Sequence, residues 1–153
     1  MRKMLICSIF LALACLFLDQ WTKVAVERAF ALGESLPLTS FLSLTYVRNQ
    51  GAAWGMFQGA HYVLAGVGIV ALVVCACYWR KIFGPSRWTL PAGALLFSGI
   101  LGNVIDRIRL GYVVDFLDFH WGASHFPCFN VADSAICVAV FCLILIQWLT
   151  KDA

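Results

Sequence analysis

Four long apolar runs alternate with polar connections along this chain of 153 residues. The runs cover about 4–26, 61–79, 88–107 and 132–150, and each contains few charged side chains. Segments of this length and composition are typical of helices that cross the hydrocarbon core of a bilayer. The pattern therefore predicts four membrane-spanning helices. Small residues, which favour close helix packing, recur in the third run: Ala92, Gly93, Ala94, Ser98, Gly99 and Gly102.

The two connections at about 27–58 and 110–130 have a different pattern. Apolar and polar residues alternate in Leu42–Val47, as in a β-strand with one buried face, and Tyr112–Phe119 is similar. The glycines and aromatic residues of 51–59 fit a short interfacial helix, or a lid over a site. We therefore expect a small extramembrane sheet that lies on the bilayer.

Composition places the chain among integral membrane proteins. Hydrophobic residues make up 62% of it and charged residues only 12%, against roughly half and a quarter in soluble domains. The formal charge of +3 comes with no basic cluster suited to nucleic acid. We predict a membrane all-α fold for residues 1–153, forming one domain of four transmembrane helices with a small extramembrane β-sheet element on the outer face.

Basic residues predict how the chain is oriented in the membrane. Four spans place both termini on one side, where six basic residues lie in short segments: Arg2, Lys3, Arg80, Lys81, Arg87 and Lys151. On the other side, five are spread over longer connections: Lys23, Arg28, Arg48, Arg107 and Arg109. Because short cytoplasmic loops are enriched in Lys and Arg, both termini are predicted to be cytoplasmic.

Cysteine and histidine spacing indicates neither a disulfide framework nor a metal centre. No C-x-x-C pair occurs, six of the seven cysteines lie in apolar runs, and the three histidines lack metal-ligand spacing. We interpret His120 and His125 as interfacial residues and expect no cofactor. The start of the chain, with Ala-Leu-Ala-Cys ending at Cys15, also resembles a lipoprotein signal, but Ala12 stands where leucine is usual.

Two aspartates near the predicted outer face are the strongest candidates for chemistry. Asp115 lies between apolar residues at the membrane boundary, and Asp133 lies at the start of the fourth run. Two converging carboxylates in a partly dry site cannot both ionise easily, so one keeps a proton and the other acts as a base. Such a pair can activate water and protonate a leaving amine.

Structural interpretations of the same acids stand beside this one. Asn130 could cap the fourth helix, with Asp133 at the third helical position, where the helix dipole favours an acid. Asp115 could be an edge-strand acid that faces water. Asp118, three residues further along the strand, points to the opposite face, and we interpret it as a solvated acid.

Other polar residues near these acids have two interpretations each. Asp19 and Lys23 are four residues apart, so they can pair on one helix face, either to anchor the helix or to contact substrate. Asn49 either binds substrate backbone or shapes a turn with Gly51. Arg107 either holds the acid pair or, through neighbouring Asp106, braces the loop.

Four motifs occur in order along the chain and carry a resemblance. They are D-Q-W-T-K at Asp19–Lys23, R-N-Q-G-A-A-W at Arg48–Trp54, G-N-V-I-D-R with V-V-D-F in Gly102–Phe116, and F-N-V-A-D-S at Phe129–Ser134. In order and placement they resemble the lipoprotein signal peptidase, or signal peptidase II, family over essentially the whole chain. The resemblance implies an intramembrane aspartyl endopeptidase of the bacterial cytoplasmic membrane. Such an enzyme removes the signal peptide from prolipoproteins, cutting just before a lipid-modified cysteine.

The resemblance also implies roles for single residues. Asp115 and Asp133 are then the catalytic pair. Substrate-binding or supporting residues are then Asp19, Lys23, Asn49, Gly51, Ala52, Asn103, Arg107 and Asn130. The expected partners are a prolipoprotein signal peptide with its lipidated cysteine and membrane lipid, with no metal, nucleotide or nucleic acid, and the chain is expected to act as a monomer.

One alternative from another functional class is a small proton-coupled transporter that uses membrane carboxylates as proton carriers. A transporter favours an acid near the middle of the bilayer and often has an inverted repeat. Here the acids gather at one predicted face, and no internal repeat is evident. The pattern therefore favours the peptidase.

Overall fold

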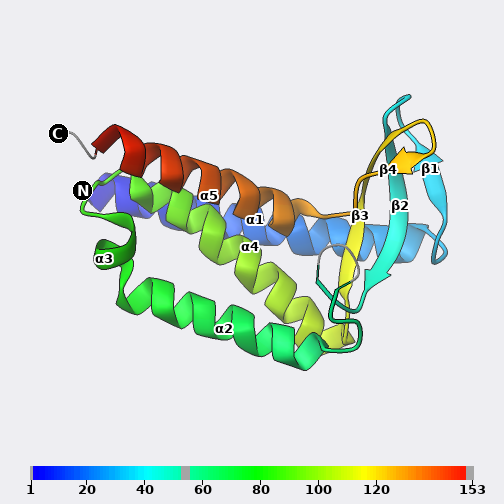
Figure 1. Cartoon of the computed structure of the whole chain (residues 1–153), viewed down its shortest axis with the longest axis horizontal. Coiled ribbons are helices and arrows are strands. Elements are labelled where there is room, and N and C mark those ends of the chain that lie inside the picture. Colours follow the sequence, from blue (N-terminus) through cyan, green and yellow to red (C-terminus); the bar gives the residue numbers. More distant parts are fainter. Residues whose placement is uncertain (1, 53–55, 151–153) are drawn as a thin grey trace.

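The computed structural model describes residues 2–52 and 56–150. Helices and strands in these ranges are α1 (Arg2–Ala29), β1 (Ser35–Pro37), β2 (Leu42–Asn49), α2 (His61–Cys77), α3 (Trp79–Phe83), α4 (Thr89–Leu110), β3 (Val113–Trp121), β4 (Ser124–His125) and α5 (Val131–Thr150). The four long helices run alongside one another, and the strands cross one end of the bundle (Figure 1). The start of α1 and the end of α5 lie at the opposite end.

Three of the described helices are long and apolar enough to cross a membrane: α1, α4 and α5. The fourth apolar helix, α2, has 17 residues and is shorter. It ends at Cys77, and the predicted run 61–79 is divided there, because Trp79 begins the separate helix α3. Large apolar side chains on these helices face outward, including Phe17 and Phe141, as expected for contact with lipid.

The central helix is α4, which packs against α1, α2 and α5. Its small residues Ala92, Gly93, Ser98, Gly99 and Gly102 are buried, which is the close packing that the sequence predicts. Gly111 ends the helix in the left-handed conformation, with φ of 79°, and the chain turns there into β3. This turn places the strand that carries Asp115 across the end of the bundle.

The four strands form one antiparallel sheet in the order β1-β2-β3-β4. Leu44 pairs with Leu117 but Val47 pairs with Asp115, so β2 has one extra residue in between, a β-bulge. Phe129, just before α5, makes an additional antiparallel bridge to Leu117. The bridge brings the first turn of α5 against β3.

The fold prediction is confirmed: the chain is a mostly helical membrane protein with three to four apolar helices and a small antiparallel sheet. Leu42–Val47 and Tyr112–Phe119 fall within or next to β2 and β3. The two short strands and the bulge were not predicted. The predicted interfacial helix or lid at 51–59 includes residues 53–55, which lie outside the described residues.

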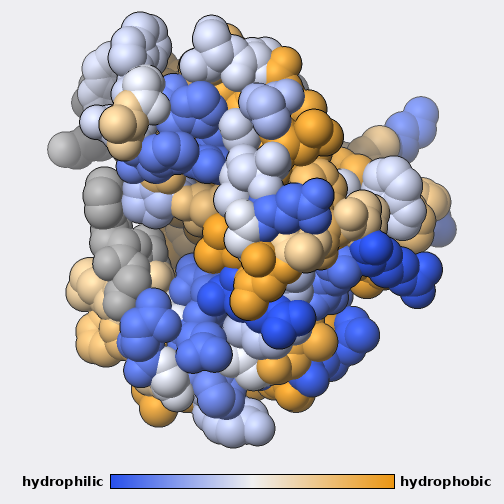
Figure 2. Space-filling model, turned by 90° about the vertical axis from the view of Figure 1, so that its right-hand side faces the viewer, coloured by the Kyte–Doolittle hydropathy of each residue, from blue (hydrophilic) through white to orange (hydrophobic). Residues whose placement is uncertain are grey.

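At the end of the molecule that carries the sheet, hydrophilic and hydrophobic side chains are interleaved (Figure 2). Exposed apolar residues on the sheet and its loops include Leu36, Phe41, Trp121 and Phe126. A water-facing sheet would usually expose polar residues, whereas aromatic and apolar side chains suit the lipid boundary. This surface therefore fits a position at the membrane interface.

Candidate active site

A cleft of about 780 Å³ opens where the sheet meets α4 and α5, and both candidate aspartates line it. Asp115 reaches it from β3 and Asp133 from the first turn of α5. The predicted site residues among its lining are Asn49, Ala52, Asn103, Arg107, Asp115 and Asp133. Asp19, Lys23, Gly51 and Asn130 support these residues from behind, through contacts described below.

Asp115 is buried, with 2% of its surface exposed, and both of its oxygens accept hydrogen bonds from amide groups. Asn130 Nδ2 donates to Oδ1 at 2.7 Å, and Asn49 Nδ2 donates to Oδ2 at 3.0 Å. An edge-strand acid facing water would have neither burial nor such partners. That alternative is therefore wrong.

Asp133 combines the two interpretations that the sequence left open. Asn130 Oδ1 accepts from the Asp133 N–H at 2.9 Å, and Asp133 Oδ2 accepts from the Asn130 N–H at 3.3 Å, which is a capping box. The other oxygen, Oδ1, accepts from Asn103 Nδ2 at 2.7 Å. Asp133 thus helps to begin α5 and still presents its carboxylate to the cleft.

The amides around the aspartates cannot be turned over without losing other bonds. Asn103 Oδ1 accepts from Lys23 Nζ at 3.0 Å, and an ammonium can only donate, so the NH₂ of Asn103 must face Asp133. The oxygens of Asn49 and Asn130 likewise accept from backbone N–H groups of Gly51 and Asp133. Each of these three amides therefore points a donor at a carboxylate.

The electrostatic surroundings of Asp115 give it a higher pKa than an ordinary carboxyl group has. Burial and, next, the negative charge of Asp133 raise the pKa of Asp115 to about 7, although hydrogen bonds from Asn49 and Asn130 act in the opposite direction. A carboxyl with this pKa can gain or lose a proton near neutral pH. The site can therefore hold one protonated and one ionised carboxyl group.

Behind the aspartates lies a buried charge cluster, Asp19–Lys23–Asp106. Lys23 Nζ lies 2.9 Å from Asp19 Oδ2, 2.9 Å from Asp106 Oδ2 and 3.0 Å from Asn103 Oδ1, so each ammonium hydrogen has a partner. Asp19 Oδ1 also accepts from the Ala132 N–H at 2.9 Å. The predicted Asp19–Lys23 pair is confirmed, and it joins α1, α4 and α5 beneath the cleft.

Arg107 braces the loop, but not through Asp106. Its guanidinium donates to the carbonyl of Gly51 at 3.0 Å and to that of Asn103 at 3.4 Å. Asp106 instead accepts from Lys23, Gln20 and the Val114 N–H. The predicted Arg107–Asp106 brace is wrong because adjacent helical residues point about 100° apart, so they reach different neighbours.

The interpretation of Asp118 as a solvated acid is also wrong. Only 7% of it is exposed, and it accepts from Thr45 Oγ1 at 2.9 Å and from His125 Nδ1 at 2.7 Å. Burial alone would raise the pKa of Asp118, but the hydrogen bonds from His125 and Thr45 lower it. Strand periodicity placed Asp118 on the other face from Asp115, but it could not show that side chains of the neighbouring strands, Thr45 of β2 and His125 of β4, bind it there.

His125 and Cys128 are among the cleft-lining residues that the sequence did not assign to the site. We interpreted His125 as an interfacial residue, and Cys128 is the one cysteine outside the apolar runs, yet both line the cleft. Burial, followed by the charges of Asp115 and Asp118, raises the pKa of Cys128 to about 12, so its thiol stays neutral. No spacing signal identifies either residue, because the β3–β4 hairpin alone brings them here.

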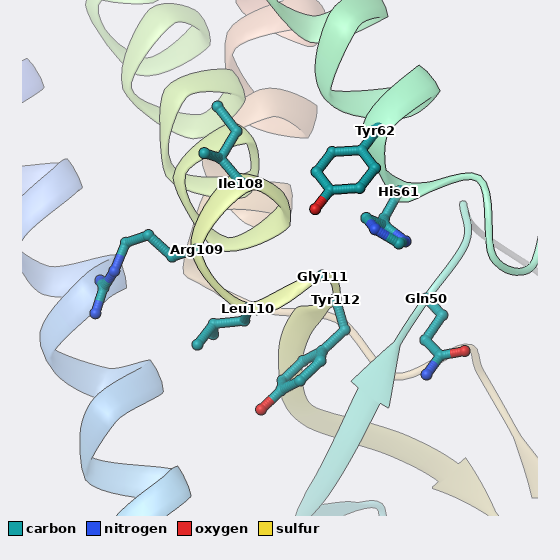
Figure 3. Close-up of a pocket in the computed structure, with 8 residues that line it drawn as sticks. All are labelled: Gln50, His61, Tyr62, Ile108, Arg109, Leu110, Gly111 and Tyr112. Carbon is teal, nitrogen blue, oxygen red and sulfur yellow. The ribbon is translucent and has the colours of Figure 1, made fainter.

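A second cavity, of about 410 Å³, lies between the start of α2, the end of α4 and the end of β2. Figure 3 shows His61 and Tyr62 facing it from α2, with Gln50 on the side of β2, while Arg109 extends away from them. Among the described residues, no carboxylate lines this cavity. Of these two cavities, only the cleft is lined by two carboxylates among the described residues, those of Asp115 and Asp133.

Known proteins are similar to this chain over most of its length. A family model described as signal peptidase (SPase) II matches residues 11–149. The lipoprotein signal peptidase of Geobacter sulfurreducens is 49% identical over 132 residues, covering 84% of this chain and 82% of that protein. That of Paraburkholderia phytofirmans is 44% identical over 138 residues, covering 88% and 80%.

A solved structure is similar over nearly the whole fold. It is described as a bacterial membrane enzyme determined by the in meso method at 2.3 Å resolution, and it superposes with a TM-score of 0.85 at 35% identity. The match covers 96% of this chain and 90% of that one. The helices and the sheet thus recur together in a membrane enzyme of bacteria.

Proposed function

The chain belongs to the signal peptidase II family of aspartic peptidases, and from this premise we propose that Asp115 and Asp133 are its catalytic pair. The substrate is a bacterial prolipoprotein, and the bond that is cut lies just before the lipid-modified cysteine. The expectation that prolipoprotein and membrane lipid are its partners follows from the same premise. Both aspartates come from one chain, which supports action as a monomer.

One observation carries this proposal. Asn130 donates its side-chain amide to Asp115 and accepts the Asp133 N–H in its capping box, so a single residue holds both carboxyl groups at one cleft. No lysine or arginine forms an ion pair with either carboxyl group within residues 2–52 and 56–150. A pair without a counter-ion retains a proton, which is the state that an aspartic peptidase requires.

In the proposed mechanism, Asp115 carries the proton and Asp133 is the base. Asp133 lies at the third position of α5, where the helix dipole favours a negative charge. It takes a proton from water as the water oxygen attacks the scissile carbonyl, while Asp115 gives its proton to the carbonyl oxygen. When the C–N bond breaks, the amine takes a proton from Asp133 and Asp115 recovers its own from the hydroxyl.

Placement of the site supports the peptidase over the proton-carrier alternative. Asp133 is the third residue of α5, and Asp115 lies on the sheet, so the pair lies at the end of the bundle rather than midway along a span. β2 and β3 border the cleft, and an extended substrate segment could be held against them. We propose that this end faces outward and that both termini are cytoplasmic.

Substitution of each aspartate by asparagine tests the proposal. Purified enzyme is incubated with a diacylated precursor peptide, and the cut before the cysteine is followed by mass spectrometry. Asp115→Asn and Asp133→Asn should each lower kcat by at least about 10²–10⁴-fold, because each removes an acid or base. Glu34→Gln, the same chemical change at an exposed residue, should leave kcat unchanged. Full cleavage by either aspartate variant would reject the pair.

A further inference from the structure

His125 lines the cleft but has no part in the chemistry described so far. Its Nδ1 lies 2.7 Å from Asp118 Oδ1, and 53% of its side chain is exposed. The neighbouring ring of His120 lies 5.1 Å away between centroids, with its own Nε2 bound to Ser43. Within the described residues, Nε2 of His125 has no hydrogen-bond partner.

Asp118 determines which way this imidazole can act. It is nearly buried, stays ionised, and accepts from Thr45 Oγ1 on its second oxygen at 2.9 Å. A carboxylate can only accept, so Nδ1 of His125 carries the hydrogen. In the neutral form of the ring, Nε2 is then an acceptor, and the hydrogen bond to the buried carboxylate fixes the orientation of the ring.

The remaining side chains of the cleft mainly supply donors. Arg48 and Arg107 cannot accept, and the oxygens of Asn49 and Asn103 are already occupied by a backbone N–H and by an ammonium. Besides the two carboxyl groups, the described lining side chains with an oxygen or imidazole nitrogen that accepts no hydrogen bond are His125, through Nε2, the exposed Gln58 and Ser134, whose Oγ donates to the Asn130 carbonyl at 2.9 Å. Of these, His125 is the one on the β3–β4 hairpin. An extended peptide presents N–H groups as well as carbonyls, and these need acceptors.

We propose that His125 is a substrate-binding residue whose Nε2 accepts a hydrogen bond from a main-chain N–H of the prolipoprotein segment in the cleft. Asp118 is its positioning residue. This inference rests on the proposed function, because it takes the cleft to be the peptide site. It adds a contact made equally in the ground state and the transition state, so its loss should affect KM more than kcat.

His125→Asn and His125→Ala distinguish substrate binding from support of the hairpin. Asparagine can still donate an N–H to Asp118 but has no atom at the position of Nε2, whereas alanine loses both. With the diacylated precursor peptide, both variants should raise KM roughly three- to tenfold, the range expected for one hydrogen bond, with kcat within about twofold. Wild-type KM in His125→Asn would overturn the proposal, because hairpin support alone would then explain the residue.

His120→Gln is the matched control, since this histidine is on the same hairpin but outside the cleft lining. It should leave KM unchanged, and an equal rise would overturn the assignment to His125. Thermal unfolding of each variant checks the fold. Asp115→Asn in parallel separates the two ideas, because cleavage by that variant would refute the proposed function itself, whatever the histidine variants do.

Precursor peptides with single N-methylated amides give a second test, which compares the wild-type enzyme with only one variant, His125→Asn. In wild-type enzyme, methylation of the contacting N–H should raise KM by a similar factor. In His125→Asn, the same methylation should add almost nothing, because the bond is already absent. If no methylated position loses its effect in the variant, the proposed contact does not exist.

Discussion

Two groups of carboxylates lie on either side of Asn103 in this fold, and they differ in whether a cation is among their partners. Asp19 and Asp106 share the ammonium of Lys23, at 2.9 Å from each. The side chains that donate to Asp115 and Asp133 within the described ranges are neutral amides, from Asn49, Asn130 and Asn103. The first group is held together by an ion pair, and the second has no such cation among the described residues.

This difference separates structure from chemistry. The first group joins helices through Lys23, because removing this one ammonium would leave two buried carboxylates without a cation. An unpaired group of two carboxyls lowers its energy by keeping a proton, and that proton is available for transfer. Asn103 links the two, since its oxygen binds Lys23 and its nitrogen binds Asp133.

The largest expected effect comes from breaking the paired cluster. Lys23→Met should lower the free energy of unfolding by about 3–5 kcal/mol, because Asp19 and Asp106 then remain buried without a cation. Unfolding in detergent micelles, followed by circular dichroism, measures the change.

A compensated variant is the matched control. Lys23→Met combined with Asp19→Asn and Asp106→Asn removes all three charges, and the side-chain oxygen of the asparagine introduced next to α5 can still accept from the Ala132 N–H. The triple variant should recover much of the lost stability. If Lys23→Met alone costs less than about 1 kcal/mol, the cluster is not the strongly coupled ion pair that its geometry indicates.

The unpaired group should respond to pH. Because the proposed mechanism needs Asp115 protonated, kcat/KM should fall as pH rises through about 7, where Asp115 loses its proton. Asn49→Ala removes a donor that favours the ionised form, so the pKa of Asp115 rises and the fall moves to higher pH. A charge-assisted hydrogen bond corresponds to a shift of about one to two pH units.

The pH profile of cleavage rates measures this shift. Gln50→Ala, one residue further along and outside the cleft lining, is the control and should keep the wild-type profile. A shift of Asn49→Ala to lower pH would contradict the sign of the argument, and an equal shift in both variants would remove Asn49 as its cause.

What the sequence could predict depends on whether a contact is local. The apolar runs and the pairing of Asp19 with Lys23 follow from spacing along one helix, and so does the capping box of Asn130 and Asp133. The capture of Asp106 by Lys23 required the relative placement of α1 and α4, which no local pattern contains. Because local patterns do not show which residues of other elements lie nearby, the sequence also predicted, wrongly, that Arg107 acts through its neighbour Asp106.

The sheet shows the same limit. Alternation predicted β2 and β3, but the extra residue between Leu44 and Val47 changes the register, and only the paired strands reveal it. Burial of Asp118 under His125 depends on the β3–β4 hairpin, which helix or strand periodicity does not describe. Sequence motifs thus identified the aspartates and the asparagines around them, whereas only the structure shows which amide binds which carboxylate.

The smallest expected effect is a loss of about 1–3 kcal/mol in the free energy of unfolding, from a substitution where α4 approaches the Asp19–Lys23–Asp106 cluster. A Cβ at Gly102 would lie 2.5 Å from Asp19 Oδ2 and 3.4 Å from the Cβ of Ala132. Gly102→Ala should therefore lower the free energy of unfolding, because Asp19 would have to move away from Lys23 or from the Ala132 N–H. Gly66→Ala on α2, where no atom lies within 4 Å of the added Cβ, is the matched control and should cost nothing. If Gly102→Ala is as stable as Gly66→Ala, Asp19 has freedom to shift, and the cluster is looser than an ion pair that fixes three helices.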